Sequence, residues 1–175
     1  MTREAHLVEL VDPSGTPLGA ATVAEAHTAP GVLHRAFSVM VTDGAGRVLL
    51  QRRATTKTRF ARRWSNTCCG HPAPGEPLTE AAAARLADEM GLYGVTLTEV
   101  GHFVYQASDP ATGRVEHEYD HVLVGRVDPD VEPQPDPAEA DDWRWMPLPA
   151  LRADTRDDSD AYTPWLRGVV RLLPE

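Results

Sequence analysis

The sequence predicts an α/β protein, a sandwich in which helices cover both sides of a mixed β-sheet. Three observations support this fold class: strand-forming segments flank one long central helix, two of them form a clear hairpin, and apolar residues recur near the C-terminus after a helix start signal. The chain has 175 residues, enough to bury one core. We therefore expect residues 1–175 to form a single domain.

The segments before the central helix have strand character. Residues 6–12 alternate weakly between apolar and polar side chains and lead into a turn. Residues 36–42 and 47–52 are rich in strand formers and are joined by the turn sequence at 43–46. This arrangement predicts an antiparallel hairpin.

The central stretch, residues 64–92, is expected to fold as a short approach, a loop and a helix. Glycine and proline are concentrated in residues 70–75, which predicts the loop. Pro77 suits a first helical position and Gly91 suits a C-terminal cap. We assign Cys68, Cys69 and His71 to the loop, and Arg85, Asp88 and Glu89 to the helix. Thiol, imidazole and carboxylate groups are thereby gathered in one place.

The rest of the chain completes the sheet and adds a last helix. We predict strands at 95–107, 119–127 and 143–146, and a helix that begins at Thr163-Pro164. Residues 128–142 are acidic and proline-rich without any basic residue, which predicts a surface loop.

The charge distribution favours a small anionic partner. The net charge of -9 argues against binding to nucleic acid. Residues 44–75 nevertheless contain no acidic residue, and such a local basic field suits a diphosphate. The basic residues of this stretch are Arg47, Arg52, Arg53, Lys57, Arg59, Arg62 and Arg63.

The cysteines and the hydropathy predict a cytoplasmic protein. Cys68 and Cys69 are adjacent, which is a poor geometry for an intrachain disulfide, so a reducing compartment fits best. No apolar run approaches the length of a membrane span, and the charged N-terminal residues do not resemble an export signal. We expect a monomer or weak dimer without membrane insertion.

Histidines and acids form a candidate metal site. Imidazoles combined with carboxylates suit zinc, manganese or magnesium. Glu116 and Glu118 would point to the same face if they lie on a regular strand. The candidate ligands are His27, His34, His71, Glu116 and Glu118.

The central stretch resembles the Nudix box, a loop-helix-loop motif. The box reads G, five residues, E, seven residues, then R-E-U-x-E-E-x-G-U, where U is aliphatic. Gly70 and Glu76 keep this spacing, but Ala84-Arg85 replaces the Arg-Glu pair. Because glutamates of this helix hold the divalent ions of the family's hydrolases, the change disfavours a hydrolase.

The combined motifs resemble the type 1 isopentenyl-diphosphate isomerases of the Nudix superfamily, from about residue 7 to residue 173. The resemblance implies a Nudix-type α/β/α sandwich and interconversion of isopentenyl and dimethylallyl diphosphate in isoprenoid biosynthesis. The matching segments, in order, are His-Thr-Ala at 27–29, Leu-His-Arg-Ala-Phe-Ser at 33–38, Arg-Arg-Ala at 52–54, Trp-Ser-Asn-Thr-Cys-Cys-Gly-His-Pro at 64–72, Gly-Glu at 75–76, Tyr105, Glu-His-Glu at 116–118 and residues 159–165.

The resemblance also implies roles for single residues. Cys69 matches the catalytic thiol of an N-[ST]-x-C-G-H-P motif, and Cys68 is its structural neighbour. Glu118, next to Tyr105, would act on the opposite side of the substrate as acid or base. Glu89 matches the carboxylate that helps to hold a second ion, Mg²⁺, on the substrate diphosphate.

The remaining matches concern metal and substrate. The five candidate ligands match the family's metal site, which takes zinc, manganese or magnesium. The matches to diphosphate contacts are Arg53, Lys57 and Arg85, and the matches to the aromatic residues that line the reacting carbons are Tyr105 and Trp165.

Two departures leave alternatives open. Val23 stands where the family commonly has a diphosphate-binding lysine, and Ala84 replaces an arginine. Arg59, Arg62 or Arg63 could supply the missing charge. The alternatives to the isomerase are an enzyme of secondary metabolism acting on a longer or altered prenyl diphosphate, a non-catalytic metal-binding protein and, last, a Nudix hydrolase.

Overall fold

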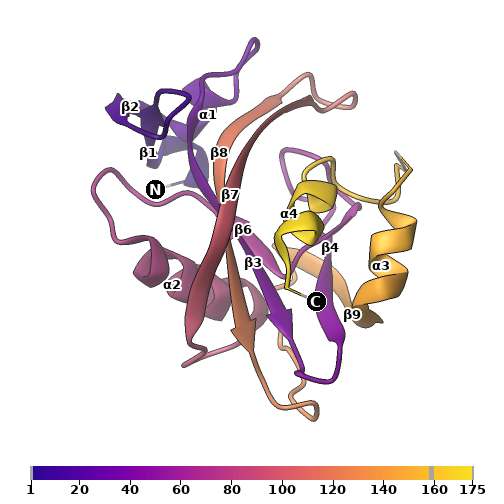
Figure 1. The fold of residues 1–175 in the computed structure, drawn as a ribbon. Coiled ribbons are helices and arrows are strands. Elements are labelled where there is room, and N and C mark those ends of the chain that lie inside the picture. The colour runs from indigo at the N-terminus through magenta and orange to yellow at the C-terminus, as the bar shows by residue number, and fades with distance from the viewer. Residues whose placement is uncertain (1, 158–159, 175) are drawn as a thin grey trace.

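A computed structural model describes residues 2–157 and 160–174 and contains one mixed sheet with helices on both sides (Figure 1). The first residue of the C-terminal family match, Ser159, lies outside the described residues. The strands are β1 (Leu7–Val11), β2 (Pro17–Thr22), β3 (His34–Thr42), β4 (Arg47–Arg53), β5 (Trp64–Ser65), β6 (Cys68–Gly70), β7 (Leu97–Ser108), β8 (Val115–Arg126) and β9 (Ala140–Pro147). The helices are the 3₁₀ turn η1 (Arg3–Ala5), α1 (Val23–Ala26), α2 (Leu78–Met90), α3 (Leu148–Asp154) and α4 (Leu166–Leu172).

Strand β3 is the hub of the sheet. It pairs in parallel with β8 and antiparallel with β1, β4 and β6, so the predicted mixed sheet is confirmed. The predicted hairpin is also confirmed, since Val41 of β3 lies opposite Leu49 of β4.

The two faces of the sheet bury different helices, as Figure 1 shows with α2 on one side and α3 and α4 on the other. Successive residues of a strand point to opposite faces. Phe37 and Val39 of β3 therefore pack with α2, while Met40 packs with α4. This alternation gives the α/β/α layering that the sequence predicts.

The central helix ends where the sequence predicts. Gly91 adopts φ 65° in its C-terminal cap, a conformation that glycine accepts without the steric cost of a Cβ. At the other end Pro77 is the N-cap, so the helix begins one residue later than predicted. The stripe of buried residues facing the sheet is Ala81, Ala82, Leu86 and Met90.

Several sequence-based boundaries were wrong. Strand β9 begins at Ala140, inside the predicted surface loop 128–142, and α4 begins at Leu166 and not at Thr163-Pro164. Cys68 and Cys69 lie on β6 and not in the loop, because their backbone pairs with β3. Strand β8 begins at Val115, which places both glutamates of the candidate metal site on a regular strand. Strand β2 and the short helices α1 and α3 were not predicted from the sequence. In the part of the chain that the structure describes, no helix is long and apolar enough to cross a membrane.

Replacement of Leu86 by alanine tests the packing of α2 against the sheet. Leu86 is fully buried, so the cavity left by Leu86→Ala should lower the free energy of unfolding by about 2–5 kcal/mol in urea denaturation. Glu80→Ala, on the exposed side of the same helix, is the control and should change it by less than about 0.5 kcal/mol. Equal effects of the two substitutions would contradict this packing.

Candidate functional site

The register of β8 places Glu118 between two of the predicted site residues. Glu118 pairs with His34 of the parallel strand β3 and with Tyr105 of the antiparallel strand β7. Residues paired across neighbouring strands present their side chains on the same face, and Glu116, two positions away, shares that face. The sheet thus assembles four predicted residues without any contribution from a flexible loop.

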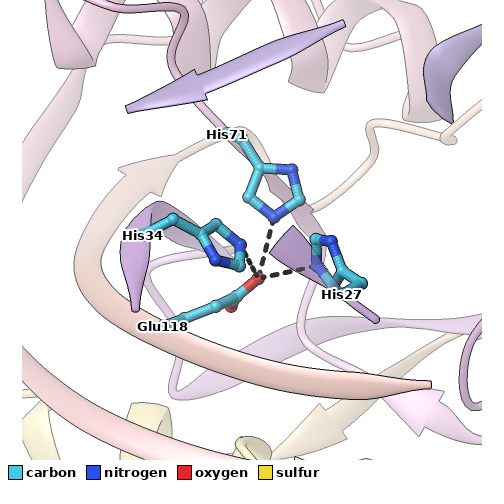
Figure 2. Close-up of side chains that lie close together, drawn as sticks. All are labelled: His27, His34, His71 and Glu118. Atoms are coloured by element: carbon cyan, nitrogen blue, oxygen red, sulfur yellow. Dashed lines mark hydrogen bonds and ion pairs between the residues drawn. The ribbon is translucent and has the colours of Figure 1, made fainter. Parts of the chain in front are cut away.

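Three imidazoles converge on a single carboxylate oxygen, Oε1 of Glu118 (Figure 2). The Nε2 atom of His71 lies 2.8 Å from Oε1, that of His34 3.6 Å and that of His27 3.8 Å. The ligand atoms of these four residues all lie within 4.8 Å of one another. This is the spacing that one bound cation requires of its ligands.

The backbone fixes the orientation of two of these imidazoles. The Nδ1 atom of His27 donates to the carbonyl of Val23 at 2.7 Å, and that of His34 donates to the carbonyl of Val32 at 2.7 Å. Both rings therefore direct Nε2 into the cluster, an arrangement typical of metal-binding histidines. Nε2 of His34 is buried without a hydrogen-bond partner among the described residues, which fits a ligand atom prepared for a cation.

Glu116 adds a second carboxylate next to His27. Its Oε2 lies 2.9 Å from Nε2 of His27. Burial lowers the pKa of His27, but the hydrogen bonds to Glu116 and Glu118 outweigh it and raise the pKa to about 9. The two carboxylates therefore stabilise positive charge at this position, as they would stabilise a bound cation. A divalent metal site built from histidine and glutamate is the interpretation that fits these residues.

Cys69 lies on β6, directly opposite Ser38 of β3. Its sulfur is 3.2 Å from both amide atoms of Asn66 and 3.6 Å from Oγ of Ser38. Burial, together with the charge of Asp120, raises the pKa of the thiol to about 12. The proton therefore stays on the sulfur at neutral pH.

Two aromatic residues lie between the thiol of Cys69 and the candidate metal ligands. Tyr105 donates its hydroxyl to Oε2 of Glu118 at 2.6 Å, and its ring centroid is 5.9 Å from that of Trp165. Trp165 in turn donates Nε1 to Oδ1 of Asn66 at 3.0 Å, the same amide that contacts Cys69. Both rings are held rigidly between the two candidate catalytic groups.

The predicted diphosphate contacts lie at the same pocket. The guanidinium of Arg53 lies over the ring of Trp165 at 5.3 Å from its centroid. Lys57 and Arg85 both contact the buried carboxylate of Glu139, at 2.6 Å and 3.1 Å. The pocket has a volume of about 580 Å³, and its wall includes Cys69, Tyr105, Glu118, Trp165 and these three cations.

Glu89 is placed apart from the four clustered ligands. Its carboxylate is buried near the C-terminal end of α2. There it accepts a hydrogen bond from Gln51 at 2.9 Å and forms an ion pair with Arg85. It reaches the pocket wall through Arg85, one of the predicted diphosphate contacts. The geometry does not bring it to the histidines.

Two residues that organise the site were not predicted from the sequence. Asn66 bridges Cys69 and Trp165, and its position at the head of the N-[ST]-x-C-G-H-P motif is a signal that could have identified it. Glu139 holds Lys57 and Arg85, but it lies in an acidic segment where nothing distinguishes it from a surface residue. Of the three arginines proposed to replace the missing lysine, only Arg59 lines this pocket among the described residues.

Comparison with known proteins identifies the family of this chain. Residues 32–166 match the model of the NUDIX domain family. An isopentenyl-diphosphate Delta-isomerase from Nocardia farcinica is 58% identical over 165 residues, which cover 94% of this chain and 93% of the relative. The chain belongs to the isopentenyl-diphosphate Delta-isomerase family of the Nudix superfamily. A second member of the isomerase family, from Halorhodospira halophila, is 46% identical over 97% of this chain and 95% of its own length.

Solved structures show that the Nudix fold is shared with more distant proteins. The crystal structure of DR0079 from Deinococcus radiodurans superimposes with a TM-score of 0.75 at 18% identity, covering 95% of this chain and 98% of that one. A MutT protein from Methanosarcina mazei gives a TM-score of 0.64 at 16% identity, covering 79% and 91%. The predicted Nudix-type sandwich is therefore confirmed.

Substitution of His27 tests the metal site directly. His27→Gln removes one buried ligand, so it should weaken Mn²⁺ or Zn²⁺ binding by more than the roughly 10–100-fold that loss of an outer partner costs, measured by titration calorimetry on chelator-stripped protein. The control is His117→Gln, which lies between the two glutamates on β8 but points to the other face. Equal affinity of the His27 variant and the unmodified protein would exclude the cluster as the metal site.

Proposed function

We propose that this protein interconverts isopentenyl diphosphate and dimethylallyl diphosphate. One observation carries the proposal: a single pocket holds a protonated thiol, a carboxylate within a histidine cluster, two aromatic rings and several cations. Its relatives of the isomerase family bear the name of this reaction. We further propose that the protein acts in the cytoplasm in isoprenoid biosynthesis, which agrees with its two free cysteines.

The reaction needs one proton added and another removed. Protonation of the terminal methylene of isopentenyl diphosphate leaves a tertiary carbocation, and loss of a proton from the carbon nearer the diphosphate gives dimethylallyl diphosphate. We assign these transfers to Cys69 on one side and Glu118 with Tyr105 on the other. The hydrogen bond that Tyr105 donates to Glu118 orients the carboxylate. The tyrosine hydroxyl also offers a path by which a proton could pass between Glu118 and the substrate.

The aromatic rings suit a cationic intermediate. Trp165 and Tyr105 present π faces that attract positive charge but do not form a bond with it. Trp165 is buried, and its ring forms part of a wall that would have to keep out water, which would convert the cation into an alcohol. Arg53, Lys57 and Arg85 would bind the diphosphate.

We propose zinc, manganese or magnesium at His27, His34, His71, Glu116 and Glu118. When bound, this ion supplies positive charge that holds Glu118 in place and sets its proton affinity. A magnesium ion accompanying the substrate diphosphate would be held with help from Glu89. The residues of the chain provide binding, orientation and the exclusion of water.

Loss of either proton-transfer group tests the proposal. Cys69→Ala and Glu118→Gln should each reduce conversion of labelled isopentenyl diphosphate by at least about 10³-fold, within the range for general acid-base groups, while circular dichroism shows an unchanged fold. The control is Cys68→Ala, since the neighbouring thiol is buried on the α2 side of the sheet. Full activity of Cys69→Ala would show that the assigned proton transfer is wrong.

A lysine at position 23 tests the diphosphate side of the pocket. Val23 lines the pocket beside the cations, so Val23→Lys should add one charged contact and lower the KM for isopentenyl diphosphate severalfold in steady-state assays. Because Val23 is buried against Val8 and Ala26, circular dichroism must first show an unchanged fold. An unchanged or higher KM in a folded variant would mean that the diphosphate does not approach α1.

A further inference from the structure

Two arginines of the pocket belong to none of the motifs that identify the family. Arg3 lies in the turn η1 near the N-terminus, and Arg59 lies between β4 and β5. Both line the pocket that contains the candidate catalytic residues. Their contacts show that they are parts of one arrangement.

Arg3 reaches the same carboxylate as two predicted diphosphate contacts. Its Nη2 lies 2.9 Å from Oε1 of Glu139, whose Oε2 lies 2.6 Å from Nζ of Lys57 and 3.1 Å from Nη2 of Arg85. Three cations from distant parts of the chain therefore surround one acid. The second acid nearby is Glu89, 3.9 Å from Nη1 of Arg3.

This group has more positive charge and more donors than its own acids can satisfy. Three cations face two carboxylates, and the two guanidiniums and the ammonium carry far more N–H donors than these carboxylates have oxygens. Such a surplus of donors at a pocket wall suits an anion with many acceptor oxygens, as in a diphosphate. The side chain of Arg3 is 48% exposed and lines the pocket, so it is accessible to such an anion.

Arg59 holds the turn that carries Arg3. Its Nη1 donates to Oε1 of Glu4 at 3.1 Å, while its Nε donates to Oε1 of Glu116 at 3.1 Å. With a side chain only 11% exposed, Arg59 is a fixed anchor between the turn and the metal-site glutamate. The backbone of Val23 secures the other end of the turn by donating to the carbonyl of His6 at 2.8 Å.

We propose that Arg3 is a diphosphate-binding residue that the N-terminal turn supplies, with the Glu4–Arg59 ion pair as its anchor. The inference rests on the proposed function, because it takes the substrate to be a prenyl diphosphate. Arg3 provides the charge that position 23 lacks, and it does so from η1, which packs over α1 beside Val23. Its partners on the substrate are the oxygens of the diphosphate and not the isoprene carbons.

Substitution of Arg3 separates binding from chemistry. Arg3→Ala should raise the KM for isopentenyl diphosphate roughly tenfold and leave kcat within about twofold, while Arg3→Lys retains most of the affinity. Glu4→Gln should raise the KM by a smaller factor, because the turn loses its anchor. Arg171→Ala, an exposed arginine at the end of α4, is the control and should change neither constant.

A binding measurement distinguishes failure of this inference from failure of the proposed function. Titration calorimetry with inorganic diphosphate and Mg²⁺ should show roughly tenfold weaker binding to Arg3→Ala than to the unmodified protein, whether or not the protein is an isomerase. Equal affinities, or an unchanged KM in a protein that converts isopentenyl diphosphate, would overturn the role of Arg3 alone. Absence of conversion by the unmodified protein would instead overturn the proposed function.

Discussion

The parallel pairing of β3 with β8 is the constraint on which the site depends. It places His34 beside Glu118, while the pairing of β8 with β7 places Tyr105 on the other side of the same carboxylate. A shift of one residue in either register would turn Glu116 and Glu118 to the opposite face and separate them from the histidines. The buried alternation of Val39 and Met40 against different helices fixes this register.

Much of the fold and the site followed from the sequence, for physical reasons that also explain the failures. Turn residues and strand formers predicted the β3–β4 hairpin, and Gly91 predicted the end of α2, because these signals are local. The contact of Asn66 with Trp165, and those of Glu139 with Lys57 and Arg85, join residues far apart in the chain. No local pattern specifies such contacts, so only the structure reveals them.

The charged residues of the pocket form two groups, one at each end. At one end, glutamates and histidines lie close together and are suited to a divalent cation. At the other, Glu139 and Glu89 keep Lys57 and Arg85 in position before any substrate arrives, which avoids reorganisation of long side chains on binding. Between the ends, Cys69 and the rings of Tyr105 and Trp165 enclose the space for the hydrocarbon.

The central claim is that this pocket transfers protons to and from the carbon skeleton of a prenyl diphosphate. The most direct measurement is NMR of isopentenyl diphosphate incubated with the purified protein and Mg²⁺ in D₂O. The account predicts dimethylallyl diphosphate with deuterium incorporated at carbon, because solvent exchanges with the proton-transfer groups between turnovers. If a protein with its metal bound gave no conversion and no deuterium exchange, that result would contradict the account.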